Sequence, residues 1–121
     1  MTGHTDTINT CAFSYTEKCF VTGSNDRTIK TWDTVKGFCT KTLAATSSVN
    51  TLQMLPNESN FVTGHLDGSL RFWSLKNEKK THEIKDYHTD SITSVSITPN
   101  GRYLLSFSRD HSIKLLDMIS Y

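Results

Sequence analysis

The chain has 121 residues, of which 36% are hydrophobic, and its 13 Lys and Arg against 12 Asp and Glu give a formal net charge of +1. This is the size and polarity of an ordinary globular domain. Because the charges are scattered and nearly balanced, they give little support to general binding of nucleic acid or of anionic membranes. No apolar run reaches the ~18 residues that a membrane span needs, so we expect no span.

The three cysteines, Cys11, Cys19 and Cys39, are an odd number and include no Cys-x-x-Cys pair. This usage is typical of a reducing compartment, so we expect a cytoplasmic protein. Cys11 lies at an apolar strand position, where we expect it to be a small core residue. Neither a metal site nor a cofactor is predicted.

Short runs rich in β-branched and aromatic residues follow one another along the chain. They lie at 8–13, 20–21 and 29–32, at 49–54, 61–62 and 70–73, and at 92–97, 104–105 and 113–116. Turn formers separate many of them, as at Pro56-Asn57-Glu58, Asp67-Gly68 and Pro99-Asn100-Gly101. No window of helical length has a sustained 3.6-residue period. These features predict antiparallel strands joined by tight turns, with almost no helix.

The runs belong to a repeat. Three segments align, namely GSNDRTIKTWD at 23–33, GHLDGSLRFWS at 64–74 and SFSRDHSIKLLD at 106–117. Their aspartates, Asp26, Asp67 and Asp110, are 41 and then 43 residues apart, and the following Trp32, Trp73 and Leu116 keep both intervals. A period of this length that ends in Trp-Asp resembles the WD repeat, in which each unit is a four-stranded propeller blade.

The resemblance implies an all-β fold, a partial WD40 β-propeller of about three four-stranded antiparallel blades with the last one incomplete. We expect one partial domain over residues 1–121, with blade units at about 1–43, 44–86 and 87–121. Propellers close with roughly 4–8 blades, so we expect the chain to be a fragment of a longer propeller. The outer faces of its first and third blades would then be apolar and unpaired, and we expect the fragment to self-associate or to be unstable alone.

The resemblance also implies a hydrogen-bonded set in the first unit, made of a loop histidine, a strand hydroxyl, the turn aspartate and the tryptophan indole, here His4, Thr22, Asp26 and Trp32. A buried carboxylate needs such donors. Taken alone, these residue types also suggest a hydrolase triad or a metal site. The set recurs in register as His88, Ser106 and Asp110, and a catalytic triad is not repeated in every blade. We therefore expect a structural role and no enzyme.

The second and third units depart from this set. The second keeps its hydroxyl, aspartate and tryptophan, Thr63, Asp67 and Trp73. It reads Ala45-Thr46-Ser47-Ser48 where Gly-His is expected, so Asp67 should lose one donor or find His65. Leu116 removes the indole donor from the third unit. We expect both blades to be braced less well than the first, by about one hydrogen bond, ~0.5–1.5 kcal/mol.

A binding face is predicted where the aspartate turns and the loops before the first strands emerge together. The turn residues expected to project there are Asn25, Arg27, Leu66, Arg109 and His111, with Asn9, Asn50 and Thr93 near the central channel. Arginines and an exposed leucine are residue types that anchor interfaces. The expected partners are other proteins or short peptides.

The irregular positions narrow the resemblance. The second unit reads VTGHLDGSLRFW at 62–73 after Thr46-Ser47-Ser48-Val49-Asn50, and the third reads LLSFSRD at 104–110 with Leu116-Asp117 in place of Trp-Asp. Over essentially the whole chain this resembles the C-terminal propeller of the autophagy-related protein 16 family. That family directs attachment of a ubiquitin-like protein to phosphatidylethanolamine, and its propeller receives targeting partners. The resemblance implies a non-catalytic scaffold that works with the autophagy conjugation machinery at autophagosomal membranes.

An alternative is a WD40 substrate adaptor of a ubiquitin ligase, or another WD40 scaffold. Many ligase adaptors carry an arginine two residues after the aspartate of Trp-Asp. The corresponding residues here are Val35, Lys76 and Ile119. This departure weighs against the adaptor without excluding it.

Overall fold

The computed structural model describes residues 3–14, 18–56, 60–75, 77 and 79–118. Every helix or strand assigned within these ranges is a strand, and none of the described residues forms a helix long and apolar enough to cross a membrane. The strands form three antiparallel sheets in the orders β1-β2-β3-β4, β5-β6-β7-β8 and β9-β10-β11. The prediction of an all-β fold with two four-stranded blades and an incomplete third is confirmed.

The strand bounds follow the predicted runs. The first sheet contains β1 (Ile8–Phe13), β2 (Cys19–Ser24), β3 (Thr28–Asp33) and β4 (Cys39–Ala44). The second contains β5 (Val49–Met54), β6 (Asn60–His65), β7 (Leu70–Ser74) and β8 (Lys79–Ile84). The third contains β9 (Ile92–Ile97), β10 (Tyr103–Ser108) and β11 (Ile113–Asp117). Asn57 and Glu58 of one predicted turn, and Lys76 and Ile119, lie outside the described residues.

The three sheets share one register. Across the second and third strands the facing pairs are Phe20 and Trp32, Phe61 and Trp73, and Leu104 and Leu116. The two aromatic pairs stack, with ring centroids 6.0 and 6.2 Å apart and interplanar angles of 7° and 11°. Because the register repeats, the aspartate turns of all three sheets reach equivalent places.

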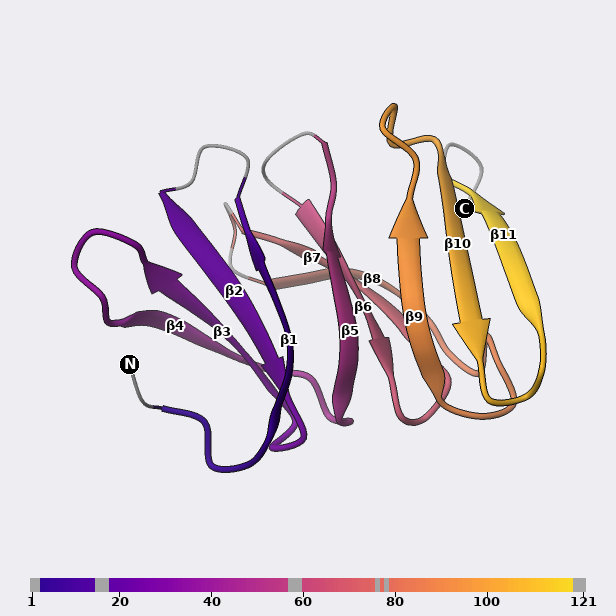
Figure 1. Ribbon diagram of the computed structural model, residues 1–121, viewed down its shortest axis with the longest axis horizontal. Helices are drawn as coiled ribbons and strands as arrows, with labels where there is room; N and C mark the ends of the chain where they lie inside the picture. Colours follow the sequence, from indigo (N-terminus) through magenta and orange to yellow (C-terminus); the bar gives the residue numbers. More distant parts are fainter. Residues whose placement is uncertain (1–2, 15–17, 57–59, 76, 78, 119–121) are drawn as a thin grey trace.

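The sheets stand side by side in an arc, with β1, β5 and β9 as neighbouring strands (Figure 1). An equivalent hydrogen bond crosses each joint between sheets. Asn9 Nδ2 donates to the Val49 carbonyl over 2.9 Å, and Asn50 Nδ2 donates to the Ile92 carbonyl over 2.9 Å. These bonds fix the spacing between the first strands of neighbouring sheets, near the residues where those strands begin.

Glycine allows the close approach at both joints. A side chain at Gly23 would collide with Val49, and one at Gly64 would collide with Ile92. The register of β10 places Phe107 at the equivalent position of the third sheet, where it is half-buried. A strand that docked on the third sheet as β5 and β9 dock on theirs would meet this ring.

Two apolar cores fill the joints. The first contains Val21, Ile29 and Leu43 from one sheet with Val49, Leu52, Met54, Phe61 and Trp73 from the next. The second contains Val62, Leu70 and Phe72 with Ile92, Val95 and Leu104. Each joint therefore buries apolar residues of one blade against apolar residues of the next.

The two ends of the arc lack such cover. Phe13 is 63% exposed, whereas its equivalent in the second sheet, Met54, is 6% exposed. At the other end Ile113 is 66% exposed, whereas its equivalent Ile29 is fully buried. Cys11 is exposed too, so the prediction that it is a core residue is wrong for this chain. Cys11 lies with Ile8, Phe13 and Phe20 on the side of the first blade that faces away from the second.

Candidate functional site

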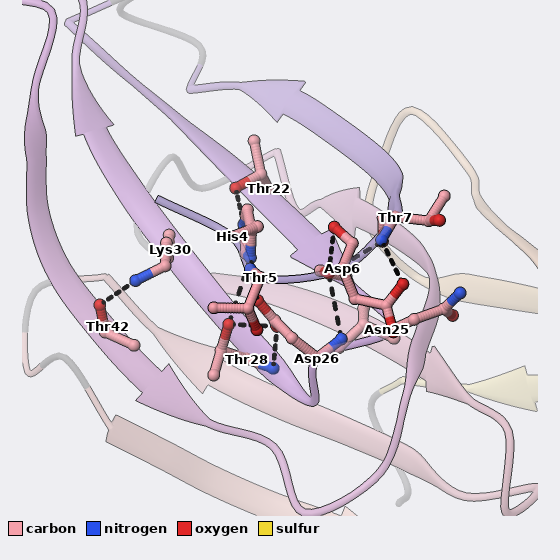
Figure 2. A network of polar contacts seen from close by, with 12 residues as sticks. His4, Thr5, Asp6, Thr7, Thr22, Asn25, Asp26, Thr28, Lys30 and Thr42 are labelled. Carbon is pink, nitrogen blue, oxygen red and sulfur yellow. Dashed lines mark hydrogen bonds and ion pairs between the residues drawn. The ribbon is translucent and has the colours of Figure 1, made fainter. Parts of the chain in front are cut away.

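The turn between β2 and β3 carries Asp26, which is bound both by the loop before β1 and by its own turn (Figure 2). His4 Nδ1 lies 2.9 Å from Asp26 Oδ2, and His4 Nε2 lies 2.6 Å from Thr22 Oγ1. The Trp32 indole donates to the same hydroxyl over 2.9 Å. Thr28 donates to the other carboxylate oxygen from its N–H at 2.9 Å and from its hydroxyl at 2.5 Å. The structure thus joins the four predicted residues in one series of hydrogen bonds.

Asp26 is held as an anion. Burial raises its pKa, but the hydrogen bonds from Thr28, His4 and the Thr5 N–H outweigh burial and lower the pKa of Asp26 well below its usual range. The charged carboxylate therefore ties the loop before β1 to the β2–β3 turn at physiological pH.

The third sheet repeats this arrangement. His88 Nε2 lies 2.7 Å from Ser106 Oγ, and His88 Nδ1 lies 3.2 Å from Asp110 Oδ2. Ser112 donates to Asp110 from its N–H over 2.8 Å and also from its hydroxyl. The Ser112 hydroxyl bond, with smaller contributions from Thr89 and His88 and against the effect of burial, lowers the pKa of Asp110 far below its usual range. Leu116 stands at the tryptophan position, and its side chain has no N–H to offer Ser106.

In the second sheet the strand hydroxyl is also bound by a histidine, but this histidine lies at the end of a strand and not in the loop before the first strand. His65, at the end of β6, lies with its Nε2 2.6 Å from Thr63 Oγ1 and its Nδ1 3.3 Å from the Ser47 carbonyl. The Trp73 indole donates to Thr63 over 2.9 Å. Two outcomes were open for Asp67, the loss of one donor or a bond to His65. The bond to His65 is not formed, because both ring nitrogens of His65 are directed to these other groups.

Asp67 is bound instead by an arginine that the sequence analysis missed. Arg71 Nη2 donates to Asp67 Oδ2 and to Thr46 Oγ1, each over 3.1 Å, and Arg71 Nε lies 2.8 Å from Glu83 Oε2. Burial raises the pKa of Asp67, but the hydrogen bonds from Arg71 and Ser69 together with the charge of Arg71 outweigh burial, and the pKa is lowered. The buried guanidinium therefore holds the loop before β5 to the turn, the task that the loop histidine performs in the other sheets.

The sequence held a signal for part of this network. Each turn aspartate is followed two residues later by a hydroxyl residue whose N–H donates to the carboxylate, namely Thr28, Ser69 and Ser112. The recurring Asp-x-Ser/Thr pattern could have found these residues. Arg71 had no such signal, because the equivalent residues of the other units are lysines, Lys30 and Lys114.

The hydrogen-bonded sets of the three sheets have a structural role, because they hold the loop before each first strand to the aspartate turn or to the strand beside it. Each histidine and each carboxylate is hydrogen-bonded within its own blade, and the hydroxyls of Thr22, Thr63 and Ser106 are bound by the histidines. Within the described part of the chain no group of three or more His, Cys, Asp or Glu side chains is placed to hold a metal ion. A site for a partner must be sought elsewhere on the blades.

A cavity of about 450 Å³ opens where the three sheets meet, on the face that carries the aspartate turns. Its lining residues are Asn9, Asn25, Asn50, Leu66, Ser91, Thr93 and Arg109. Six of the eight residues predicted for partner binding are thus gathered around one cavity, and Ser91 is an addition. Arg27 and His111 do not line it.

Three lining residues hold equivalent positions, each directly before a turn aspartate. The backbone N–H groups of Asn25, Leu66 and Arg109 donate to the carbonyls of the preceding loops, Thr7, Ser48 and Ser91, over 3.0, 3.1 and 3.1 Å. Side chains that start from such fixed backbone are preorganised for a partner. They bring an amide, an apolar group and a guanidinium to the rim of one cavity.

Arg27 and His111 occupy a later position of the same turns, which explains their absence from the cavity. Both have left-handed backbone, with φ of 68° and 69°, and Gly68 holds this position in the second sheet with φ of 82°. Their side chains are exposed at the tips of the turns.

Repeated antiparallel sheets of this kind, braced by histidine, hydroxyl, aspartate and tryptophan, define the blades of a WD40 propeller. Residues 1–33, 37–74 and 79–117 match the WD40 family, described as WD domain, G-beta repeat, and the chain belongs to this family.

Among known proteins, the chain is similar to protein tipD of Dictyostelium discoideum, with 38% identity over an alignment of 123 positions that covers 100% of this chain and 20% of the relative. It is also similar to autophagy-related protein 16 of Arabidopsis thaliana, with 36% identity over an alignment of 120 positions that covers 97% of this chain and 23% of the relative. A shorter match, 38% over 45 residues, is to eukaryotic translation initiation factor 3 subunit I of Bombyx mori and covers 37% of this chain and 13% of the relative. The chain spans about a fifth of the length of the first two relatives.

Proposed function

We propose that this chain is part of a non-catalytic protein-interaction scaffold, the WD40 region of an autophagy protein that directs lipid conjugation of a ubiquitin-like protein to membranes. The observation that carries the binding role is the cavity, where side chains from all three blades converge on the face of the aspartate turns. A preformed hollow with an exposed leucine and an arginine at its rim has the features of an interface anchor.

The autophagy assignment has separate support. Two relatives match 100% and 97% of the chain at 38% and 36% identity, and the second is an autophagy-related protein 16. The irregular second and third blades carry the same resemblance at Thr46-Ser47-Ser48 and at Leu116. The proposed partners are therefore the autophagy conjugation machinery and its targeting proteins. The proposed location is the cytoplasm, with recruitment to autophagosomal membranes.

Nucleic acid is not a proposed partner. Among the residues that line the cavity Arg109 is the single charged one, and binding along a phosphate backbone needs several cations.

The test is made in the full-length protein, with Leu66→Ala and Arg109→Ala combined. We expect the double variant to impair recruitment of the lipid-conjugation machinery to particular membranes, as imaged in cells, while its melting temperature stays within a few degrees of the parent. Arg27→Ala is the matched control, because Arg27 is an exposed arginine on the same face that does not line the cavity. Equal recruitment by the double variant and the control would show that this cavity is not the receiving surface.

A further inference from the structure

We propose that the cavity takes an extended protein segment in which a carboxylate side chain stands beside an apolar side chain. This rests on the proposed function as a protein-binding platform and adds the chemistry of the partner. The inference follows from the three equivalent turn positions, which present an amide, an apolar group and a cation in that order along the arc, at Asn25, Leu66 and Arg109.

Leu66 supplies the apolar contact. Its side chain is 57% exposed although the preceding His65 is fully buried. The bond from its N–H to the Ser48 carbonyl, at 3.1 Å, fixes the backbone so that the side chain stays at the cavity rim. A partner that covers Leu66 with an apolar side chain removes both surfaces from water, which favours binding.

Arg109 sets the charge of the partner. It is exposed, and it forms no ion pair with any acidic residue in the described part of the chain. Two acidic residues flank its backbone and accept hydrogen bonds from other groups. Asp110, the next residue, accepts the N–H groups of Thr89 and Ser112, and Asp90, next to the Ser91 carbonyl that the Arg109 N–H binds, accepts the Ser91 N–H. A guanidinium binds a carboxylate through two parallel hydrogen bonds, whereas a cationic segment is repelled.

The remaining lining residues are largely committed within the chain. Asn9 uses its amide N–H₂ on the Asn25 side-chain oxygen at 2.7 Å and on the Val49 carbonyl at 2.9 Å. The Thr93 hydroxyl donates to the Phe107 carbonyl over 3.1 Å. The Asn25 amide N–H₂ and the Arg109 guanidinium are two side-chain donors that remain available to a partner, one on each side of Leu66. Donors on either side of a leucine suit a segment with acceptors on either side of an apolar residue.

An array of random ten-residue peptides, probed with the labelled full-length protein, tests this. We expect the bound peptides to be enriched in Asp or Glu within two positions of Leu, Ile or Phe. Arg109→Glu is expected to weaken the binding of these peptides about tenfold, which is the effect of losing one exposed charge-assisted contact. Among random peptides this variant is expected to select Lys or Arg in place of Asp or Glu. Arg27→Glu makes the same change of charge at an exposed turn residue outside the cavity, so it is expected to leave the selection unaltered. Circular dichroism of each variant checks that the sheets are retained.

Two results would overturn the proposal in different ways. Peptides that require Leu66, tested by Leu66→Asp, but show no acidic enrichment and no response to Arg109→Glu would disprove the partner's chemistry and leave the platform intact. The second result is that the parent protein and a Leu66→Asp, Arg109→Glu double variant select the same peptides. That result would show that this cavity is not a binding site, and it would remove the main observation behind the proposed function.

Discussion

The imidazole of His65 lies 2.6 Å from the Thr63 hydroxyl, and this bond is made in the first sheet by a histidine from a different part of the blade. His4 precedes β1, whereas His65 ends β6. Ala45, which is buried, stands where the first and third units have their loop histidines. The second blade has therefore exchanged a loop histidine for a strand histidine and kept the bond.

This exchange predicts compensation between Ala45 and His65. His65→Ser alone should lower the free energy of unfolding by about 2–4 kcal/mol, because it leaves a cavity beside Ala45 and removes the partner of Thr63. Ala45→His alone should also destabilise, by overpacking. The double variant restores the arrangement of the other blades, so we expect it to regain most of the loss. Denaturant midpoints of the four proteins measure this, and losses that simply add would contradict the exchange.

His65 also predicts a pH dependence. Burial, and after it the charge of Arg71, lower the pKa of His65 from 6.5 to about 4. Between these two pH values His65 is protonated in the unfolded chain and neutral in the folded chain. The free energy of unfolding therefore falls as the pH falls through this window, by a total of about 3 kcal/mol. His65→Gln should flatten the loss between about pH 6.5 and about pH 4. Asp26 and Asp110 add their own loss only below the usual carboxyl range, because their pKa values are lowered. Urea midpoints across this range are the readout, and a slope that survives in His65→Gln would assign it to another group.

The first and third networks predict unequal sensitivity. Asp26→Ala leaves His4 without its carboxylate beside a buried Trp32, so we expect it to cost about 1–3 kcal/mol. Asp110→Ala should cost less, since the third sheet has Leu116 where the first has the indole that completes the series. Guanidinium midpoints of the two variants compare them, and an equal or reversed order would remove this assignment of the networks.

The open ends of the arc predict self-association of the 121-residue chain. Phe13 and Ile113 are exposed at opposite ends, at positions that are buried inside the joints. Phe107 obstructs the approach, because glycine holds its position at both internal joints. We therefore expect Phe107→Gly to shift association to lower protein concentration and Ile113→Lys to shift it to higher concentration. Light scattering against concentration measures both, and a stable, cooperatively folding monomer would refute the expectation.

Much of the fold was readable in advance because it is repetitive. A strand period of two and a 41- to 43-residue repeat specify which faces are apolar and where the turns come, and these are local properties of the chain. The His4, Thr22, Asp26 and Trp32 set was implied by the resemblance to the WD repeat, and the shared register explains why a similar set recurs as His88, Ser106 and Asp110.

Contacts between strands that are distant in sequence had to be seen in space. Three features depend on side-chain directions and volumes. They are the use of His65 in place of a loop histidine, the binding of Asp67 by Arg71, and the separation of Arg27 and His111 from the cavity. The sequence by itself therefore determined the blades and their bracing aspartates, because backbone pairing follows residue pattern. Only the tertiary structure decided which side chains share the cavity, because this depends on how three twisted sheets pack against one another.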